Sequence, residues 1–457
     1  MAQKRQVTNI FEKIKDFIKG AFAKMFTKQE IKRIVGADAV ITDAMLLKIK
    51  EWRDMLSGKA EWTDEDVESL RLERGICREF AFTVTGEMES KVSNEALDGL
   101  YQKAIANLCE NFQDGLALGS MIIKPLGGSK VEFVPADRFI PLAFDDEDNL
   151  VKVCFIDTKY IADDNIYYRF EKHDFADGVL TISHKAFHSH SAGALGTVCS
   201  LVEVEEWANY PEEISYAVDR PIYGFYKNPL PNDIDRSPCG VSIFECERSS
   251  IKKADKQYGR LDWEFESGER AIYADVTAFG TVGGRKVLPK LKGRLYKAVD
   301  IAAGDGKDLF ETFSPEFRDT AIRSGLEEFK RNIEFGVGLA YGDLSTPQLV
   351  EKTAAEVITS KQRKYSTVNA IQKKLKTCLE GLVFGLAFMN GLTKSGYEFT
   401  CNFEDSILTD DETRRAIDRQ DVAMEAMKLW EYRMKWYGED EETAKKMTES
   451  EKAEVIE

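Results

Sequence analysis

The sequence predicts an α+β protein that combines long helices with an antiparallel β meander. Three patterns lead to this prediction. Apolar residues recur at helical spacing through residues 345–391, short runs with a period of two follow one another through residues 120–207, and helical, highly charged sequence returns in residues 405–457. With 457 residues and 43% hydrophobic content, the chain can bury substantial cores.

The chain before the meander has helical periodicity. Residues 1–30 form a basic amphipathic pattern, with isoleucine and phenylalanine on one side and lysine around them. Such a stripe either packs on the body of its own protein or lies on a membrane surface, and we favour packing on the body. Helical patterns continue to about Gly119 and contain Trp52 and Trp62, which we expect to anchor the packing.

The meander consists of alternating runs separated by turn signals. The turns include Gly127-Gly128, Asp177-Gly178 and the acidic stretch DDEDN at 145–149, and the runs are MIIKPL, KVEFVPA, RFIPLAF, LVKVCFIDTKYI, NIYYRFEKHDF and VLTISHKAF. The acidic stretch lacks the glycine and the distal glutamate of a calcium-binding loop, so we interpret it as an ordinary turn.

Two helices and a basic segment follow the meander. Residues 242–267 and 316–341 each carry an apolar seam of heptad type, which predicts two helices that pack on neighbours. Between them, residues 269–315 have β-like sequence. This segment includes RKVLPKLKGRLYK, residues 285–297, which contains six basic residues and no acidic one.

The stretch 345–391 predicts one very long helix. Ser345 or Thr346 can cap it, Pro347 suits its first turn, and Asn390-Gly391 supplies a left-handed stop. At 1.5 Å per residue such a helix is roughly 60 Å long, which is far beyond the average. Downstream, we expect a further helix over residues 410–436 and a frayed end at ESEKAEVIE, residues 449–457.

Catalytic and metal-binding motifs are missing from the sequence. The eight cysteines form no CxxC pair, which indicates reduced thiols in a cytosolic setting, and no GxSxG, HExxH or Walker motif is present. HxxxHxH spacing would place His188 and His190 on one strand face, as in a metal site, but no neighbouring cysteine or carboxylate motif completes it. We therefore expect no catalytic residue, cofactor or metal.

The net charge and the hydropathy argue against two further classes of protein, namely general nucleic-acid-binding proteins and secreted or membrane-bound proteins. A net charge of -16 argues against a general nucleic-acid-binding protein, because affinity for phosphate comes mainly from basic residues. Half of this excess lies in residues 404–457, which hold seventeen acidic and nine basic residues. No signal-peptide core is present, and the longest apolar run, near 382–389, is too short to span a bilayer, so we expect neither secretion nor a membrane partner.

The order of these elements resembles that of the portal proteins of tailed bacteriophages. The match extends along nearly the whole chain and is strongest between 238 and 386. It includes PCGVSIFECERSSIKKADKQYGRLDWEFESG, then SPEFRDTAIRSGLEEFKRNIEFGVGLAYGDLS, and EKTAAEV at the start of the long helix. The sequence is similar to the siphophage-type group that includes Bacillus and Listeria phage portals.

This resemblance implies the portal fold, with a wing, a stem, a clip and a crown. It implies long helices, an antiparallel β meander in the wing, a small α/β clip and a helical C-terminal crown. Carried over by position, the wing is 1–241 with its meander at 120–207, the stem helices are 242–268 and 316–341, the clip is 269–315, the tunnel loop is 342–348, the long wing helix and return strand are 349–404, and the crown is 405–457.

The resemblance also implies a set of site residues. The tunnel loop, which would face DNA, is Gly342, Asp343, Leu344, Ser345, Thr346, Pro347 and Gln348. Possible tunnel contacts on the second stem helix are Lys330 and Arg331. The clip residues that would contact DNA or a partner protein are Arg285, Lys286, Lys290, Lys292, Arg294 and Lys297.

The implied function is structural and not enzymatic. About twelve subunits would form a ring at one capsid vertex of the virion, after assembly in the host cytoplasm. Double-stranded DNA would pass through the ring during packaging and ejection. The terminase large subunit, an adaptor or head-completion protein, and the major capsid and scaffolding proteins would be its partners.

Two alternatives remain open from the sequence. A portal-like subunit of a domesticated prophage or a gene transfer particle would have the same sequence pattern. A metal-dependent DNA-processing enzyme would need a histidine or carboxylate constellation that the sequence does not contain.

Overall fold

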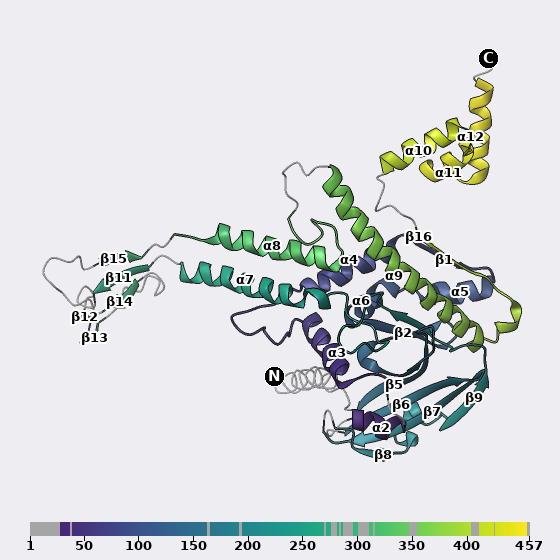
Figure 1. The fold of residues 1–457 in the computed structure, drawn as a ribbon, viewed down its shortest axis with the longest axis horizontal. Coiled ribbons are helices and arrows are strands. Elements are labelled where there is room, and N and C mark those ends of the chain that lie inside the picture. Colours follow the sequence, from purple (N-terminus) through teal and green to yellow (C-terminus); the bar gives the residue numbers. More distant parts are fainter. Residues whose placement is uncertain are drawn as a thin grey trace.

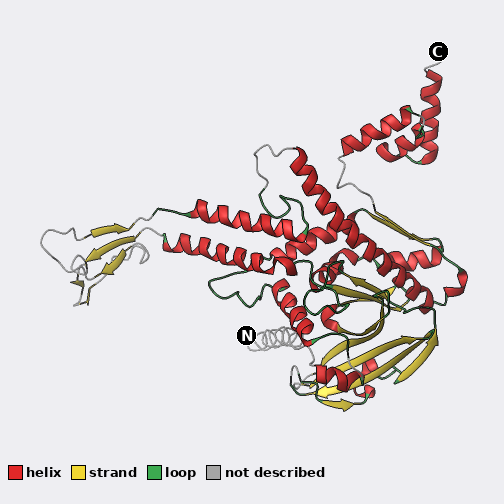
Figure 2. Ribbon diagram, viewed as in Figure 1, coloured by secondary structure: helices red, strands yellow, loops and turns green. Residues whose placement is uncertain are grey.

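The chain has an α+β fold, as the sequence predicted (Figures 1 and 2). The computed structural model describes residues 28–454, with gaps at 37–38, 162–164, 192–193, 269–270, 276–280, 283–284, 287–295, 300–309, 314–315, 347–353, 404–410 and 425. Nearly all of the predicted amphipathic segment 1–30 therefore lies outside the described residues. None of the described helices is both long and apolar enough to cross a membrane.

In the part of the chain that the structure describes, five helices precede strand β2. They are α2 (Lys28–Val35), α3 (Asp43–Leu56), α4 (Leu72–Gly86), α5 (Glu95–Ala104) and α6 (Leu108–Leu118). The two tryptophans anchor packing as predicted, because Trp52 is fully buried and donates to the Glu245 carboxylate at 2.6 Å, while Trp62 donates to Asp255 at 2.9 Å. Both bonds fix this helical layer to residues 245–255.

The predicted meander is antiparallel, but it divides into two sheets. One sheet has the order β10-β2-β3, with β2 (Ser120–Gly127), β3 (Lys130–Pro135) and β10 (Gly224–Lys227). The larger sheet runs β4 (Phe139–Phe144), β5 (Leu150–Ile161), β6 (Asn165–Ala176), β7 (Val179–Ser189) and β8 (Thr197–Cys199), with β9 (Glu213–Ala217) also on β7. A 3-10 turn at Ala136–Arg138 separates the sheets.

The acidic stretch at 145–149 is an ordinary turn, in agreement with the sequence interpretation. The carboxylate of Asp145 accepts hydrogen bonds from the backbone N–H groups of Glu147 and Asn149, at 2.9 and 2.8 Å. This pattern closes the turn between β4 and β5.

The long helix, α9 (Ala354–Met389), packs against the smaller sheet. Its inner face is completely buried, at Ile371, Leu375, Cys378, Leu379, Leu382, Val383 and Leu386. Close contact with β10 requires glycine, since a Cβ at Gly224 would lie 2.1 Å from the Cys378 carbonyl oxygen. The predicted stop is confirmed, because Gly391 follows the helix with a left-handed φ of 69°. Pro347, the expected first turn, lies outside the described residues.

Two strands far apart in sequence pair beside this helix. The expected return strand, β16 (Phe399–Phe403), pairs antiparallel with β1 (Met88–Val92). The sequence analysis placed β1 inside a helical region, so that part of the prediction was wrong. The pairing ties the end of α9 to the N-terminal helical layer.

Helices α7 (Arg248–Ser267) and α8 (Asp319–Val337) lie side by side (Figure 1). Both helices are shorter than predicted. Residues 245–247 form a 3-10 turn before α7, and Gly338 ends α8 with a left-handed φ of 85°. The buried carboxylate of Glu264 accepts from the backbone N–H of Arg318 at 2.9 Å and from its guanidinium at 2.7 Å, which joins the two helices at their distal ends.

The described residues between α7 and α8 form short strands, as the β-like sequence of residues 269–315 predicted. Three of these strands form a small sheet. In it, β11 (Ala271–Asp275) lies between β14 (Tyr296–Val299), which is parallel to it, and β15 (Phe310–Phe313), which is antiparallel. A separate pair joins β12 (Thr281–Val282) to β13 (Arg285–Lys286).

The described part of the C-terminal region, from residue 411 to 454, forms three helices, where the sequence predicted one with a frayed end. They are α10 (Asp411–Ala423), α11 (Leu429–Tyr437) and α12 (Glu441–Glu454). The predicted helix over 410–436 is interrupted between α10 and α11, where the N–H groups of Ala426 and Met427 both bond to the Asp421 carbonyl. Helix α12 includes part of the segment for which fraying was expected, up to Glu454.

Candidate functional site: the connection between α8 and α9

A buried carboxylate organises the chain that leaves α8. Glu334, in the last turn of the helix, is completely buried. Its Oε1 accepts hydrogen bonds from the backbone N–H groups of Gly342, Leu344 and Ser345, at 3.1, 2.6 and 2.7 Å. Its Oε2 accepts from the Ser345 hydroxyl at 2.9 Å. Four donors from one short loop thus replace the water that this charge loses on burial.

A second carboxylate on α8 holds the next residue. The backbone N–H of Thr346 donates to Glu327 Oε2 at 2.6 Å, and Lys330 Nζ lies 2.9 Å from the other oxygen. Burial acts to raise the pKa of Glu327, but the Thr346 N–H and Lys330 outweigh it and the pKa is lowered. Glu327 therefore stays ionised and keeps Thr346 against the helix.

Helix α9 fixes the loop from the other side. Lys364 Nζ lies 3.1 Å from Asp343 Oδ2 and 2.8 Å from Glu79 Oε1 on α4. Burial acts to lower the pKa of Lys364, but the two carboxylates outweigh it, so the pKa is raised and the amine stays charged. The loop, α4 and α9 therefore meet at one cation.

An arginine covers the start of the loop. The guanidinium of Arg363 lies 4.8 Å from the ring centre of Phe335 and 5.0 Å from that of Tyr341, and it donates to the Leu339 carbonyl at 3.1 Å. Cation–π contacts of this kind hold an arginine in a fixed orientation.

The structure brings five of the seven predicted tunnel-loop residues together, and Pro347 and Gln348 lie outside the described residues. The two predicted tunnel cations are on α8, but each is paired with an acid of its own helix. Lys330 contacts Glu327 at 2.9 Å, and Arg331 contacts Glu328 at 3.8 Å. The positive charge at this position is therefore largely neutralised.

Sequence reasoning missed the residues that anchor this loop. Glu334 lies between Ile333 and Val337 in the buried stripe of α8, and an acid in an apolar stripe is the signal that could have revealed it. Arg363 and Lys364 belong to a basic stretch that resembles any solvated helix face. Their partners come from distant segments, so no local pattern marks them.

The predicted clip cations occupy two different sheets. Arg285 and Lys286 form β13, in register with Val282 and Thr281. Lys297 is on β14, in register with Tyr273 of β11. The remaining three, Lys290, Lys292 and Arg294, lie outside the described residues.

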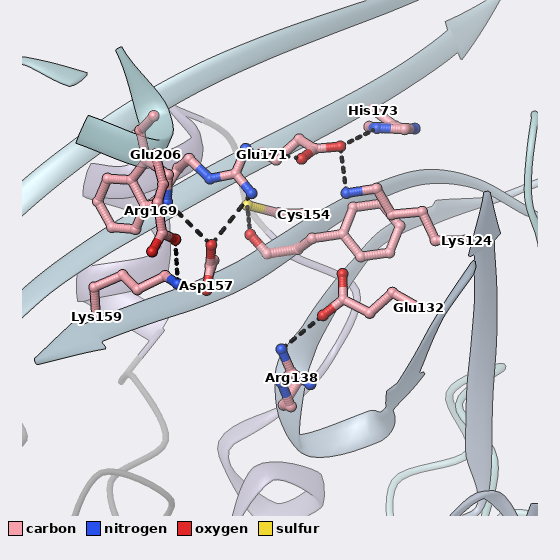
Figure 3. A network of polar contacts seen from close by, with 12 residues as sticks. Lys124, Glu132, Arg138, Cys154, Asp157, Lys159, Arg169, Glu171, His173 and Glu206 are labelled. Atoms are coloured by element: carbon pink, nitrogen blue, oxygen red, sulfur yellow. Dashed lines mark hydrogen bonds and ion pairs between the residues drawn. The ribbon is translucent and has the colours of Figure 1, made fainter. Parts of the chain in front are cut away.

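A buried charge network centred on Glu171 of β6 joins the larger sheet to Lys124 of β2 in the smaller sheet (Figure 3). Glu171 Oε1 lies 2.6 Å from Lys124 Nζ and 2.7 Å from His173 Nε2, and Glu171 Oε2 lies 3.3 Å from Arg169. Burial acts to raise the pKa of Glu171, but Lys124, His173 and Arg169 hold it well below its usual value. Burial lowers the pKa of His173, so this ring is neutral near pH 7.

The metal hypothesis concerned His188 and His190. Strand β7 ends at Ser189, so the two residues do not share a strand face, although their ring centres are 4.5 Å apart. His188 instead bonds to the Asn165 side chain at 2.8 Å and stacks on Tyr167. Among the described residues, no three His, Cys, Asp or Glu side chains are grouped as metal ligands.

No protein-family model matches the chain, and no curated protein is significantly similar to it in sequence. Its functional interpretation therefore rests on the geometry of α7, α8 and α9 and on the patterns in its sequence.

Proposed function

We propose that this chain is a portal subunit, which forms a ring at one capsid vertex and serves as the conduit for packaging and ejection of double-stranded DNA. The ring contains about twelve copies, arranged around a cyclic axis. In this assignment α7 and α8 are the stem, the strands between them are the clip, and α10–α12 belong to the crown.

The observation that carries this proposal is the arrangement around the α8–α9 connection. A pair of stem helices holds a small β unit at one end and an α/β body at the other (Figure 2). The connection to α9 is anchored by Glu334, Glu327 and Lys364 at the base of that pair. A subunit that reaches from a central channel to a surrounding shell needs such a division into an elongated stem and a broad body.

The charge pattern supports a conduit better than it supports a tight DNA-binding protein. DNA must slide through a portal, so strong phosphate contacts would hinder it. The ion pairs of Lys330 with Glu327 and of Arg331 with Glu328 leave weak contacts at most. The net charge of -16 also favours sliding over tight binding, because an acidic channel wall repels the duplex.

The basic clip is the surface that we assign to partners. Arg285, Lys286 and Lys297, together with Lys290, Lys292 and Arg294, would contact exiting DNA, the terminase motor or an adaptor protein. An acidic partner surface would associate quickly with such a patch.

Loss of this chain should leave particles empty. In the genome that carries it, deletion of the gene should yield capsids without DNA, and the intact gene supplied in trans should restore filled particles. Reversal of the clip charges by Lys290→Glu and Lys292→Glu should fail to restore them, whereas the exposed body pair Lys91→Glu and Lys130→Glu should succeed. Encapsidated DNA is the readout, and DNA-filled particles in the deletion strain would contradict the portal assignment.

A further inference from the structure

An exposed aromatic and basic surface surrounds the α8–α9 connection. Phe82 of α4, Phe335 of α8 and Tyr341 of the loop are 56%, 59% and 40% exposed, which is unusual for three large rings near one another. Beside them is a pocket of about 640 Å³, which Phe82, Asp343, Lys361 and Lys364 line. We call this surface, together with the exposed Arg78 of α4, the aromatic edge.

An acidic loop lies on the other side of the stem. Residues 63–69 connect α3 to α4 and run along α7 on the side away from α8 (Figure 1). The side chains of Glu65, Asp66 and Glu68 are exposed, and the neighbouring Trp263 of α7 is 65% exposed. The loop and Trp263 also line a common pocket of about 720 Å³.

The acidic loop is held rigidly against the stem. Asp255 of α7 is fully buried and accepts from the Trp62 indole and from the Leu70 backbone N–H, each at 2.9 Å, so both ends of the loop are fixed. Its middle touches α7 directly, since a Cβ at Gly259 would lie 2.5 Å from the Asp66 carbonyl oxygen. The loop therefore presents its charges in a defined position and loses little entropy on binding.

The acidic loop and helix α8 lie on different faces of α7, and the aromatic edge begins at Phe335 near the end of α8. The side chain of Gln257 donates to the Ile322 carbonyl at 3.1 Å, which places α8 on the face of α7 that the acidic loop does not cover. A surface that is complementary to a different surface of the same molecule generates a head-to-tail contact. Such a contact builds a ring when the rotation between successive copies closes, and an open filament when it does not.

We propose that the acidic loop of one copy docks on the aromatic edge of the next copy. The inference rests on the proposed ring function and names the contact that closes the ring. Glu65 and Glu68 face Arg78 and Lys361 of the neighbour, and Trp263 packs against its exposed rings. Charge complementarity sets the register, while the buried aromatic rings supply most of the affinity.

Reversing the charges on one surface at a time tests this contact. One variant carries Glu65→Lys and Glu68→Lys, and the other carries Arg78→Glu and Lys361→Glu. In each, like charges oppose each other at every interface, so we expect the fraction of chain in rings to fall about tenfold or more by native mass spectrometry. The matched control, Glu89→Lys and Glu212→Lys, reverses two exposed acids of the body and should assemble as the wild type does.

Mixing the two variants separates a lost contact from a folding defect. In the mixture, every interface can pair a basic loop with an acidic edge or an acidic loop with a basic edge. We expect alternating rings with equal numbers of both variants. The docking contact would be overturned if either variant alone formed rings normally, or if the mixture formed none. In both cases a ring formed by the wild-type chain would still support the portal proposal. A wild-type chain that forms no rings would contradict both.

Discussion

Replacing Glu334 with alanine should lower the free energy of unfolding by about 3–5 kcal/mol, because four hydrogen bonds to one buried carboxylate are lost. The backbone N–H groups of Gly342, Leu344 and Ser345 and the Ser345 hydroxyl would lose their acceptor together. Denaturant unfolding of the full chain measures the change. Hydrogen exchange at those three amides should accelerate well beyond the exchange of amides in the larger sheet.

Glu334→Gln is the matched control for this prediction. The amide oxygen can still accept the three backbone N–H bonds, and the amide nitrogen can donate to the Ser345 hydroxyl, so we expect a loss of only about 1–2 kcal/mol. A change below about 1 kcal/mol in the alanine variant would show that the carboxylate does not hold the loop. Unchanged amide exchange at Gly342 to Ser345 would lead to the same conclusion.

Glu73→Gln should stabilise the protein at alkaline pH and have little effect at acidic pH. Glu73 of α4 is fully buried, and no other described residue donates a hydrogen bond to its carboxylate. Burial, reinforced by the nearby Asp255, raises the pKa of Glu73 from 4.5 to about 7. The folded state therefore holds this proton more tightly than the unfolded state does.

The sign of the pH dependence follows from linkage. A raised folded-state pKa gives stability that is complete below the unfolded value near 4.5 and is lost as the pH rises to about 7. Above that pH the ionised Glu73 costs the wild type roughly 3 kcal/mol, which glutamine avoids. Urea unfolding at pH 5 and pH 8 measures the effect, with the exposed Glu89→Gln as the control. Equal stability differences at the two pH values would contradict the assignment.

Sequence patterns predicted those features that depend only on residues close together in the sequence. Gly391 ends α9 where the sequence placed its stop, since a left-handed residue requires no distant partner. The stem helices were also predicted, because their apolar seams arise from residues three and four apart. Even the neutralisation of Lys330 and Arg331 was visible in principle, since Glu327 and Glu328 precede them by three residues.

Long-range pairing is the part that the sequence did not reveal. Strand β2 pairs with β10 about a hundred residues later, and β1 pairs with β16 from the other end of the chain, so neither of these two pairings has a local signature. The contact between Glu334 and the loop at 342–345 also has no local signature. Glu334 accepts from backbone N–H groups, which every residue except proline carries. The acceptor is identifiable only after the fold places the loop beside it.

The mass and symmetry of the purified full-length chain test the central claim most directly. Native mass spectrometry combined with electron-microscopic class averages should show closed rings of about twelve subunits around a central opening. In those rings the α8–α9 connection, with Gly342 to Thr346, should line the channel. A compact dimer without an opening, or rings in which this connection faces outward, would contradict the account.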